Sequence, residues 1–370
     1  MPHIFVGSSF NGHGHTKLHS IELKRHALTI ASSGSGKGAC QILPNCIYWS
    51  GSLVVVDPKG EAAEFTAKNK APRDPSRLAI LDPFEYANLP HAFRVRFNPL
   101  DLVTDTDDLR MLANGMIMRT GAETDPFWND SAEAIIAGLL AFIADTCSPD
   151  ERHLGTVRDL LRSLRDNDQR GAIVTLLKAC KAYGGLAIDA AGRLSQDGAT
   201  VRSILENLDT ATLWLTSDKI VSSLRGGDNL NLHQLKQGRL KLFLVIPPDR
   251  IDDYGTFLRL FVRCTLSIMW KKTGAQQKGT PCLFLLDEFA ALGKISEIRT
   301  SALQQGRSFG LHVWPFVISW GQLVTLYGQD GAEDFIASSD LFCAYGLQDN
   351  VTPELISRRI GNINSQDVAG

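Results

Sequence analysis

The chain has 370 residues, of which 44% are hydrophobic and 21% are charged, with 38 Lys and Arg against 40 Asp and Glu. This composition is typical of a globular protein with enough apolar residues for a sizeable core, and the length predicts two or three domain-sized units. The net charge of −2 excludes a strongly polycationic nucleic-acid-binding protein of the kind that composition alone would reveal.

Cysteines and apolar runs bear on the compartment. The seven cysteines are scattered and form no CxxC pair, which predicts reduced, buried thiols in a cytosolic protein rather than a disulfide framework. The N-terminus lacks the charged and then apolar layout of a signal peptide. The longest apolar run, residues 134–144, is shorter than the roughly 20 residues needed to cross a bilayer, so we expect a buried helix there.

Three histidines lie close together near the start of the chain, at His13, His15 and His19. They form an HxH-like cluster, but no matching set of cysteines or carboxylates accompanies them. A flexible polar loop is therefore expected here in preference to a metal site.

The first chemical motif joins a strand, a glycine-rich turn and a helix. Residues 28–31 form a short apolar run, and residues 39–47 have the apolar periodicity of a helix. Backbone N–H groups in such a turn converge on a phosphate, the helix N-terminus adds its positive dipole end, and Lys37 would reach the outer phosphates. The predicted phosphate-binding residues are Ser32, Ser33, Gly34, Ser35, Gly36, Lys37, Gly38 and Ala39.

This segment departs from the general P-loop pattern GxxxxGK[ST] at both ends. Ala31 replaces the first Gly, and Gly38 replaces the Ser or Thr that ligates Mg²⁺. The alternative, a glycine-rich loop that merely contains a lysine, is disfavoured by the strand–loop–helix context. Pro44 is expected to bend or end the helix after about two turns.

A second buried strand is predicted at residues 53–56, and the charged segment DPKGE follows it. Charged residues at the carboxyl end of a parallel strand face the ligand crevice, so Lys59 and Glu61 are candidate site residues. A solvated turn explains the same residues equally well.

The segment from about 102 to 222 shows helical periodicity and few strand-like runs, with helices expected at residues 107–118, 131–145, 156–164 and 171–182. A helix start is expected at Asp130 and Ser131. We interpret residues 102–222 as an all-α domain inserted into a nucleotide-binding domain formed by residues 1–101 and 223–370. Residues 152–202 contain nine basic side chains, which can contact phosphate backbones or form solvated helix faces.

The alternation of strands and helices then resumes. Strands are expected at residues 240–246, 282–286, 311–318 and 341–345, and helices at residues 253–272 and 295–305. This order predicts an α/β fold with a mainly parallel sheet flanked by helices.

The second chemical motif follows the apolar run at residues 282–286. Asp287 is placed to hold Mg²⁺, and Glu288 to orient and deprotonate the attacking water. An Asp-Glu pair that merely caps a strand is the alternative, and the P-loop upstream argues against it. Asp57 and Glu288 are far apart in the sequence, so no hydrolytic pair is inferred from them.

Several blocks of the chain resemble the coupling-protein ATPases of type IV secretion and conjugation, the TraG/TraD-like family. The resemblance covers nearly the whole chain. Its blocks are SGSGKGACQILPN at 33–45, WSGSLVVVDPKGE at 49–61, LDP at 81–83, RFNPLD at 96–101, FW at 127–128, LFLLDEFAALGKI at 283–295, GRSFGL at 306–311, QLVTLYG at 322–328 and ISRRIG at 356–361. Gly38 fits this family's P-loop better than the general pattern.

The resemblance implies a RecA-like P-loop motor that uses ATP and Mg²⁺ and assembles as a ring, often a hexamer. It implies a place at the cytoplasmic face of the bacterial inner membrane, with membrane segments outside this chain. The implied partners are single-stranded DNA held by its backbone, or a relaxase or effector protein, and components of the secretion channel.

The resemblance also bears on single residues. Arg307 matches a family arginine that would act on the nucleotide of a neighbouring subunit, although a plain surface arginine is as good a reading, and Arg358 and Arg359 are weaker candidates. Ile318 replaces a glutamine that many members have before the serine, here Ser319.

The leading hypothesis is an ATP-driven motor that recruits and translocates DNA or nucleoprotein into a type IV secretion channel. The alternative is a weakly hydrolysing or non-hydrolysing nucleotide-bound adaptor that docks secreted proteins, which Gly38 and Ile318 favour. A helicase-like ATPase outside secretion is a third reading.

Overall fold

A seven-stranded sheet lies at the centre of the protein, as a computed structural model shows. The structure describes residues 2–11, 15–69, 77–118, 126–196, 198–228, 230–271 and 280–361. Every pair of neighbouring strands in this sheet is parallel. In sheet order the strands are β5 (Arg77–Leu81), β6 (Leu240–Leu244), β4 (Ser52–Val56), β7 (Cys282–Leu286), β8 (Leu311–Val317), β3 (His26–Ala31) and β9 (Ser339–Tyr345).

Helices cover both faces of this sheet because successive strand residues point to opposite sides. In β4, Leu53 and Val55 pack into one core, and Val54 and Val56 pack into the other. All residues of β4 and β7 are buried, as expected for central strands of a parallel sheet. The first core includes residues of α1 (Leu43–Tyr48) and α2 (Glu61–Asn69), and the second those of α10 (Ile251–Trp270) and α12 (Trp320–Ala337).

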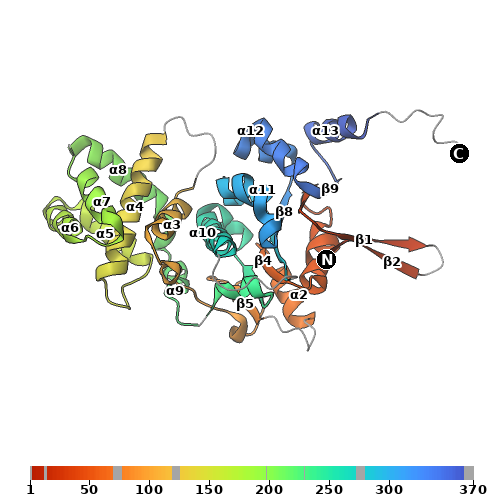
Figure 1. Cartoon of the computed structure of the whole chain (residues 1–370), viewed down its shortest axis with the longest axis horizontal. Coiled ribbons are helices and arrows are strands. Elements are labelled where there is room, and N and C mark those ends of the chain that lie inside the picture. Colours follow the sequence, from red (N-terminus) through yellow and green to blue (C-terminus); the bar gives the residue numbers. More distant parts are fainter. Residues whose placement is uncertain are drawn as a thin grey trace.

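Seven helices between β5 and β6 form a helical lobe, α3 to α9, at the left of Figure 1. The described residues from 102 to 222 contain no strand. Helix α3 packs against both α10 and α4, so it lies between the sheet and the rest of the lobe. The helices are α3 (Thr106–Met116), α4 (Pro126–Thr146), α5 (Gly155–Arg165), α6 (Asn167–Ala179), α7 (Leu186–Leu194), α8 (Gly198–Ala211) and α9 (Asp218–Ser223).

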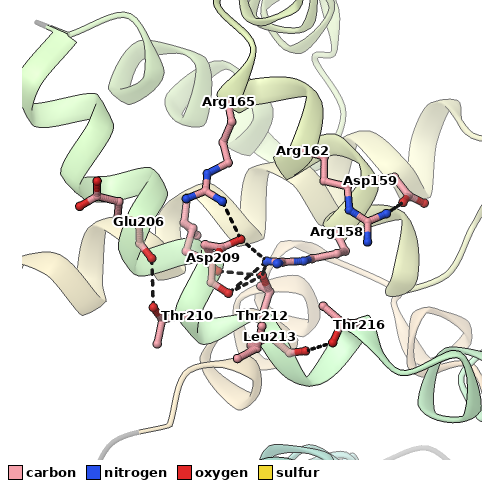
Figure 2. Close-up of polar contacts among 11 residues, drawn as sticks. Arg158, Asp159, Arg162, Arg165, Glu206, Asp209, Thr210, Thr212, Leu213 and Thr216 are labelled. Atoms are coloured by element: carbon pink, nitrogen blue, oxygen red, sulfur yellow. Dashed lines mark hydrogen bonds and ion pairs between the residues drawn. The ribbon is translucent and has the colours of Figure 1, made fainter.

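Ion pairs tie α5 to the end of α8 (Figure 2). The buried guanidinium of Arg158 lies 2.6 Å from Oδ1 of Asp209 and donates a hydrogen bond to the Thr212 hydroxyl at 3.1 Å. Arg165 lies 3.2 Å from the same Asp209 oxygen, so one carboxylate serves two arginines. These two members of the basic segment at residues 152–202 are therefore engaged within the lobe.

Helix α4 is longer than the apolar run at residues 134–144 suggested. Its segment Phe127–Thr146 is long and apolar enough to cross a membrane by length and composition, contrary to the sequence-based expectation. The same segment is 56% buried inside the protein, against α3, α5, α7 and α8. That packing is typical of the core helix of a globular domain. The expected helix start at Asp130 and Ser131 was wrong, because the first turn begins at Pro126, where the ring is tolerated.

A hairpin precedes the sheet, in place of the expected polar loop. Strands β1 (His3–Asn11) and β2 (His15–Glu22) pair antiparallel and lie at the right of Figure 1. His15 and His19 belong to β2, and the His19 ring contacts the Ser9 hydroxyl at 2.7 Å. His13 lies outside the described residues. Within the described part of the chain, no cluster of three or more His, Cys, Asp or Glu forms a metal site.

The expectation for Pro44 was partly wrong. The helix continues past Pro44 to Tyr48, and the irregularity precedes the proline as a π-helical turn at Gly38–Ile42, in which the Leu43 N–H bonds to the Gly38 carbonyl. Pro44 has no N–H and so cannot donate the usual α-helical hydrogen bond to the carbonyl four residues earlier. The wider π-helical turn before it accommodates this missing bond. The predicted helix at residues 295–305 is likewise a π-turn, Ile298–Ala302, followed by α11 (Leu303–Gln305), and the last helix is α13 (Val351–Ile360).

Candidate nucleotide-binding site

The glycine-rich turn follows β3 and has the backbone shape that phosphate binding requires. Gly34 and Gly36 have φ angles of 76° and 93°, in the left-handed region that only glycine adopts without strain. The Ser35 N–H and hydroxyl both donate to the Ser32 carbonyl, at 3.3 and 2.7 Å. These bonds close the turn and leave its outer backbone free to face a ligand.

The end of β9 supports this turn from behind. The Ser32 hydroxyl donates a hydrogen bond to the Gly346 carbonyl. A Cβ atom at Gly346 would lie 2.6 Å from Cβ of Ser35, so any side chain there would displace the turn. Ser32 and Ser35 thus have structural contacts, while their neighbours line the site.

Lys37 stands at the start of the helix that follows the turn and is 8% exposed. Its Nζ atom lies 2.9 Å from Oδ1 of Asp287 and 3.0 Å from Oε1 of Glu288. Burial alone would lower the pKa of Lys37, but the two carboxylates outweigh it and raise the pKa above the ordinary value. The side chain is therefore an ammonium, held between the two acids that the second motif supplies.

Asp287 and Glu288 extend from the end of β7, the strand beside β4. Burial raises the pKa of Asp287 despite the nearby Lys37. Glu288 has a φ angle of 48°, one of three non-glycine residues in the described chain with positive φ. Such backbone strain is concentrated at functional sites, because the surrounding fold must stabilise it.

Asp57, at the end of β4, is a site residue that the sequence did not single out. Its side chain is buried and accepts a hydrogen bond from the Ala63 N–H at 2.8 Å, at the start of α2. Burial raises the pKa of Asp57 to about 7; the N–H groups of Ala63 and Ala62 lower it, and Asp287 and Glu61 raise it further. Between about pH 4 and pH 7, Asp57 therefore keeps a proton that an ordinary aspartate has lost.

The two motifs and the β4 segment surround one cavity of about 200 Å³. Asp57 and Glu288 both line this cavity. The fold therefore brings together two residues whose distance in the sequence had argued against a shared site. The polar and glycine lining of the cavity is Ser33, Gly34, Gly36, Lys37, Gly38, Asp57, Lys59, Glu61, Asp287 and Glu288, and Ala39 lies among its apolar residues. Lys59 and Glu61 are therefore beside the phosphate-binding turn, not in a remote loop.

A divalent cation fits this lining. Oδ1 of Asp287 is buried and has no hydrogen bond in the described chain beyond its ion pair with Lys37. A carboxylate oxygen in that condition is a suitable ligand for Mg²⁺, which keeps most of its water and takes one or two protein carboxylates. Asp287 would hold the ion, with nucleotide phosphates and water completing the shell.

Arg307 lies apart from these residues. It is exposed on a 3₁₀ turn, Gly306–Phe309, that precedes β8, whereas the P-loop, Asp57 and Asp287 follow the ends of their strands. Arg307 therefore lies toward the amino-terminal ends of the strands, away from the P-loop of its own chain. Arg358 and Arg359 are paired on the surface with Glu354 and Glu333.

A carboxamide is present near Ile318, although the sequence lacks one at that position. The side-chain oxygen of Gln322, on the first turn of α12, accepts a hydrogen bond from the Ile318 N–H at 2.8 Å. Val317, the residue before Ile318, pairs with Ile30 of the strand that leads into the P-loop.

Comparisons with known proteins agree with the geometry. A model of the family described as "Type IV secretory system Conjugative DNA transfer" matches residues 3–369. The conjugal transfer protein TraG of Rhizobium radiobacter is 26% identical over 351 residues, covering 91% of this chain and 52% of the relative. VirD4 of Agrobacterium fabrum is 24% identical over 345 residues, covering 91% and 49%. The chain thus spans about half the length of these relatives.

Among solved structures, the plasmid coupling protein TrwB in complex with ADP and Mg²⁺ superposes with a TM-score of 0.62 at 18% identity, covering 86% of this chain and 70% of TrwB. This similarity confirms the RecA-like α/β fold, and the family model confirms the resemblance found in the sequence. The chain belongs to the type IV secretion conjugative DNA transfer family, the coupling proteins.

Proposed function

We propose that this chain binds and hydrolyses ATP as a motor that recruits DNA or nucleoprotein and translocates it into a type IV secretion or conjugation channel. The observation that carries the proposal is the position of the Lys37 ammonium, 2.9 and 3.0 Å from Asp287 and Glu288 beside a turn with two left-handed glycines. That arrangement brings a phosphate-binding cation and the acids needed for hydrolysis to one cavity.

Each residue has a separate role in this mechanism. The N–H groups of the turn and the following helix bind the phosphates, and Lys37 exchanges its carboxylate partners for the outer phosphate oxygens. Mg²⁺, when bound, neutralises phosphate charge. Glu288, whose side chain is 34% exposed, accepts the proton of the attacking water.

Residues at the rim complete the proposed site. Lys59 and Glu61 are placed to contact the nucleotide from the β4 side. Arg307 would stabilise the charge that develops on the γ-phosphate held by a neighbouring subunit, in a homo-oligomeric ring such as a hexamer. That role agrees with its exposure and its distance along the sheet from the P-loop of its own chain.

We further propose that residues 102–222 act as one inserted domain that faces the substrate. The helical lobe is linked to the sheet through α3, which packs on α10. The proposed partners are single-stranded DNA or a relaxase or effector protein, and channel components. The proposed location is the cytoplasmic face of the bacterial inner membrane, with membrane contact through segments outside this chain.

The test is ATP turnover by the purified chain with and without single-stranded DNA, with Lys37→Ala as the inactive reference. Turnover that single-stranded DNA stimulates and that Lys37→Ala removes supports the motor. Turnover that Lys37→Ala leaves intact belongs to a contaminating enzyme and sinks the proposal.

A non-hydrolysing adaptor is the second candidate, because Gly38 supplies no hydroxyl for Mg²⁺ at its position. This candidate predicts that the chain binds nucleotide with negligible turnover, even when DNA and secreted proteins are both present. The same assay therefore separates the two candidates.

A further inference from the structure

A second charged cavity, of about 530 Å³, lies where the helical lobe meets the sheet. Helix α10 and the segment after Glu288 form one side, and α3 and α4 form the other. Four cationic side chains line it, Arg110, Arg259, Arg263 and Lys294, against two carboxylates, Glu133 and Glu297. Four positive charges against two negative ones leave an excess of two, in a protein whose net charge is −2.

The two carboxylates of this cavity already have partners. Glu297 accepts a hydrogen bond from Nη1 of Arg263 at 2.8 Å and lies 2.5 Å from Nη2. Glu133 accepts a hydrogen bond from the Asn114 amide at 2.7 Å. Glu297 offsets the charge of Arg263, and Asn114 is neutral. The excess of two charges therefore arises from Arg110, which is exposed, Lys294, which is half-buried, and the buried Arg259, less the one charge of Glu133.

Arg263 stabilises one wall of this cavity. It is 5% exposed and lines the cavity, and its guanidinium pairs with Glu297. Its Nε atom is buried close to Gly115 of α3 and has no hydrogen-bond partner in the part of the chain that the structure describes. Because that atom is covered, an anion in the cavity would contact Arg110 and Lys294 instead.

The cavity is built on rigid elements. The Arg259 guanidinium, 1% exposed, donates to the carbonyl groups of Leu292 and Lys294. A Cβ atom at Gly255 would lie 2.6 Å from the Ala291 carbonyl, so α10 lies directly against the segment that follows Glu288. These contacts fix Lys294 relative to α10 and pre-form the site.

We propose that this cavity binds backbone phosphates of the single-stranded DNA that the motor moves, one at Arg110 and one at Lys294, an inference that rests on the proposed function. Guanidinium groups and a lysine suit a phosphodiester, since arginine donates a planar fork of N–H groups to phosphate oxygens. The family to which the chain belongs handles DNA transfer, which favours a nucleic acid over an acidic protein segment.

A DNA phosphate bound at this site would be linked to ATP hydrolysis through the segment between Lys294 and Glu288. Lys294 and Glu288 lie at the two ends of one short segment, the 3₁₀ turn Phe289–Leu292 with Gly293 after it. A phosphate that contacts Lys294 therefore acts on the segment whose first residue is the proposed catalytic base. The strained backbone of Glu288, with φ at 48°, is the part of that segment most sensitive to a shift.

The experiment measures binding of single-stranded oligothymidylate by fluorescence anisotropy over a range of salt concentrations. The double variant Arg110→Ala/Lys294→Ala removes two cations from the cavity. Lys17→Ala/Lys68→Ala removes two exposed cations outside the helical lobe and is the matched control. The cavity variant is expected to lose about tenfold or more in affinity, and its slope of log affinity against log salt to fall by about 1.4. The control pair is expected to stay close to wild type.

Three outcomes overturn the inference. If the cavity variant and the control pair bind the oligonucleotide equally well, the DNA binds outside this cavity. If the wild type does not bind it, the chain has no such DNA site, and ATP turnover still tests the proposed motor independently. Displacement of the oligonucleotide by polyglutamate at equal charge identifies a site for an acidic protein segment instead. If the double variant is unfolded by circular dichroism, Arg110→Ala alone, on the surface of α3, is expected to lower the salt slope by about 0.7.

Discussion

The Lys37 ammonium lies 2.9 Å from Oδ1 of Asp287, so the cation of the first motif neutralises the acid of the second. In the proposed function Lys37 has two successive partners, first the carboxylates of Asp287 and Glu288 and then the nucleotide phosphates. It also offsets part of the rise in the pKa of Asp287 that burial causes. The following predictions begin from this pair.

Lys37→Ala is expected to lower nucleotide affinity by about 100-fold or more, because a buried charge-assisted contact to phosphate is lost and Asp287 is left without its cation. Binding of a fluorescent ATP analogue measures the effect. Lys68→Ala, at an exposed α2 position, removes the same charge outside the site and should bind as wild type does. Equal affinities in the two variants would exclude Lys37 from phosphate binding.

Glu288→Gln separates binding from hydrolysis. The amide keeps the size of the side chain but cannot accept the proton of water, so turnover is expected to fall by about 10²–10⁴-fold while nucleotide affinity stays similar. Phosphate released at fixed reaction times measures turnover, and binding of a fluorescent ATP analogue measures nucleotide affinity. Glu354→Gln, at an exposed α13 pair, is the control. Unchanged turnover in Glu288→Gln would assign the base to another residue.

Much of this site was predictable because it depends on local sequence. A glycine-rich turn between a strand and a helix needs only neighbouring residues, and so does the Asp-Glu pair after the apolar run at β7. Their meeting at Lys37 follows from parallel strands, whose carboxyl ends share one edge of the sheet. The order of strands and helices likewise predicted the α/β fold.

Other features depend on tertiary contacts that no short pattern contains. Asp57 was passed over because its burial and its bond to the Ala63 N–H require α2 to dock beside β4. The hairpin β1–β2 was missed because, among His3 to Ser9, only Ile4 is buried and the other side chains are partly or fully exposed. Arg259 and Arg263 lie on a helix whose pattern predicts apolar burial, yet both are buried by contacts with residues 292–297.

The pKa of Asp57 predicts a pH dependence of stability. Because the folded-state pKa of about 7 exceeds the ordinary 3.8, the native protein holds this proton more tightly than the unfolded chain. The contribution is full below about pH 4 and is lost as pH rises through 7, with a magnitude on the order of 4 kcal/mol. Asp57→Asn keeps an oxygen for the Ala63 N–H but cannot ionise.

Urea unfolding between pH 5 and pH 8 in the absence of metal tests this prediction. The free energy of unfolding of Asp57→Asn, relative to wild type, is expected to rise across that range. Asp150→Asn, at an exposed turn position, should track the wild type at each pH. Parallel curves for Asp57→Asn and wild type would mean that Asp57 is charged in the folded protein.

Two Gly→Ala substitutions are expected to change stability in opposite directions, because α4 packs closely on α7 at Gly138 whereas Gly171 of α6 faces open space. A Cβ atom at Gly138 would lie 2.3 Å from Cβ of Ala190 and 2.6 Å from the Leu186 carbonyl, so Gly138→Ala should destabilise the protein by about 1–3 kcal/mol. Gly171 of α6 has open space at this position, so Gly171→Ala should stabilise it by about 0.5–1 kcal/mol. Denaturant midpoints measure both, and destabilisation by Gly171→Ala would contradict the packing described for α6.

Arg307 offers a test of action between subunits. If Arg307 serves the nucleotide of a neighbour, Arg307→Ala should lower turnover about 10³-fold or more while leaving its own P-loop intact. Lys37→Ala subunits lack a working P-loop but still present Arg307. Mixing the two inactive variants should therefore restore part of the turnover, because some interfaces join an intact P-loop to an intact arginine.

The matched control replaces the Lys37→Ala partner with the double variant Lys37→Ala/Arg307→Ala, which supplies neither group. Turnover should return in the first mixture, pass through a maximum as the ratio is varied, and stay absent in the second. Recovery in both mixtures would show that subunits assist one another without Arg307, and recovery in neither would remove Arg307 from the catalytic residues. Because the exposed Arg307 lies toward the amino-terminal ends of the strands, away from Lys37 of its own chain, only the assembled protein can give the first result.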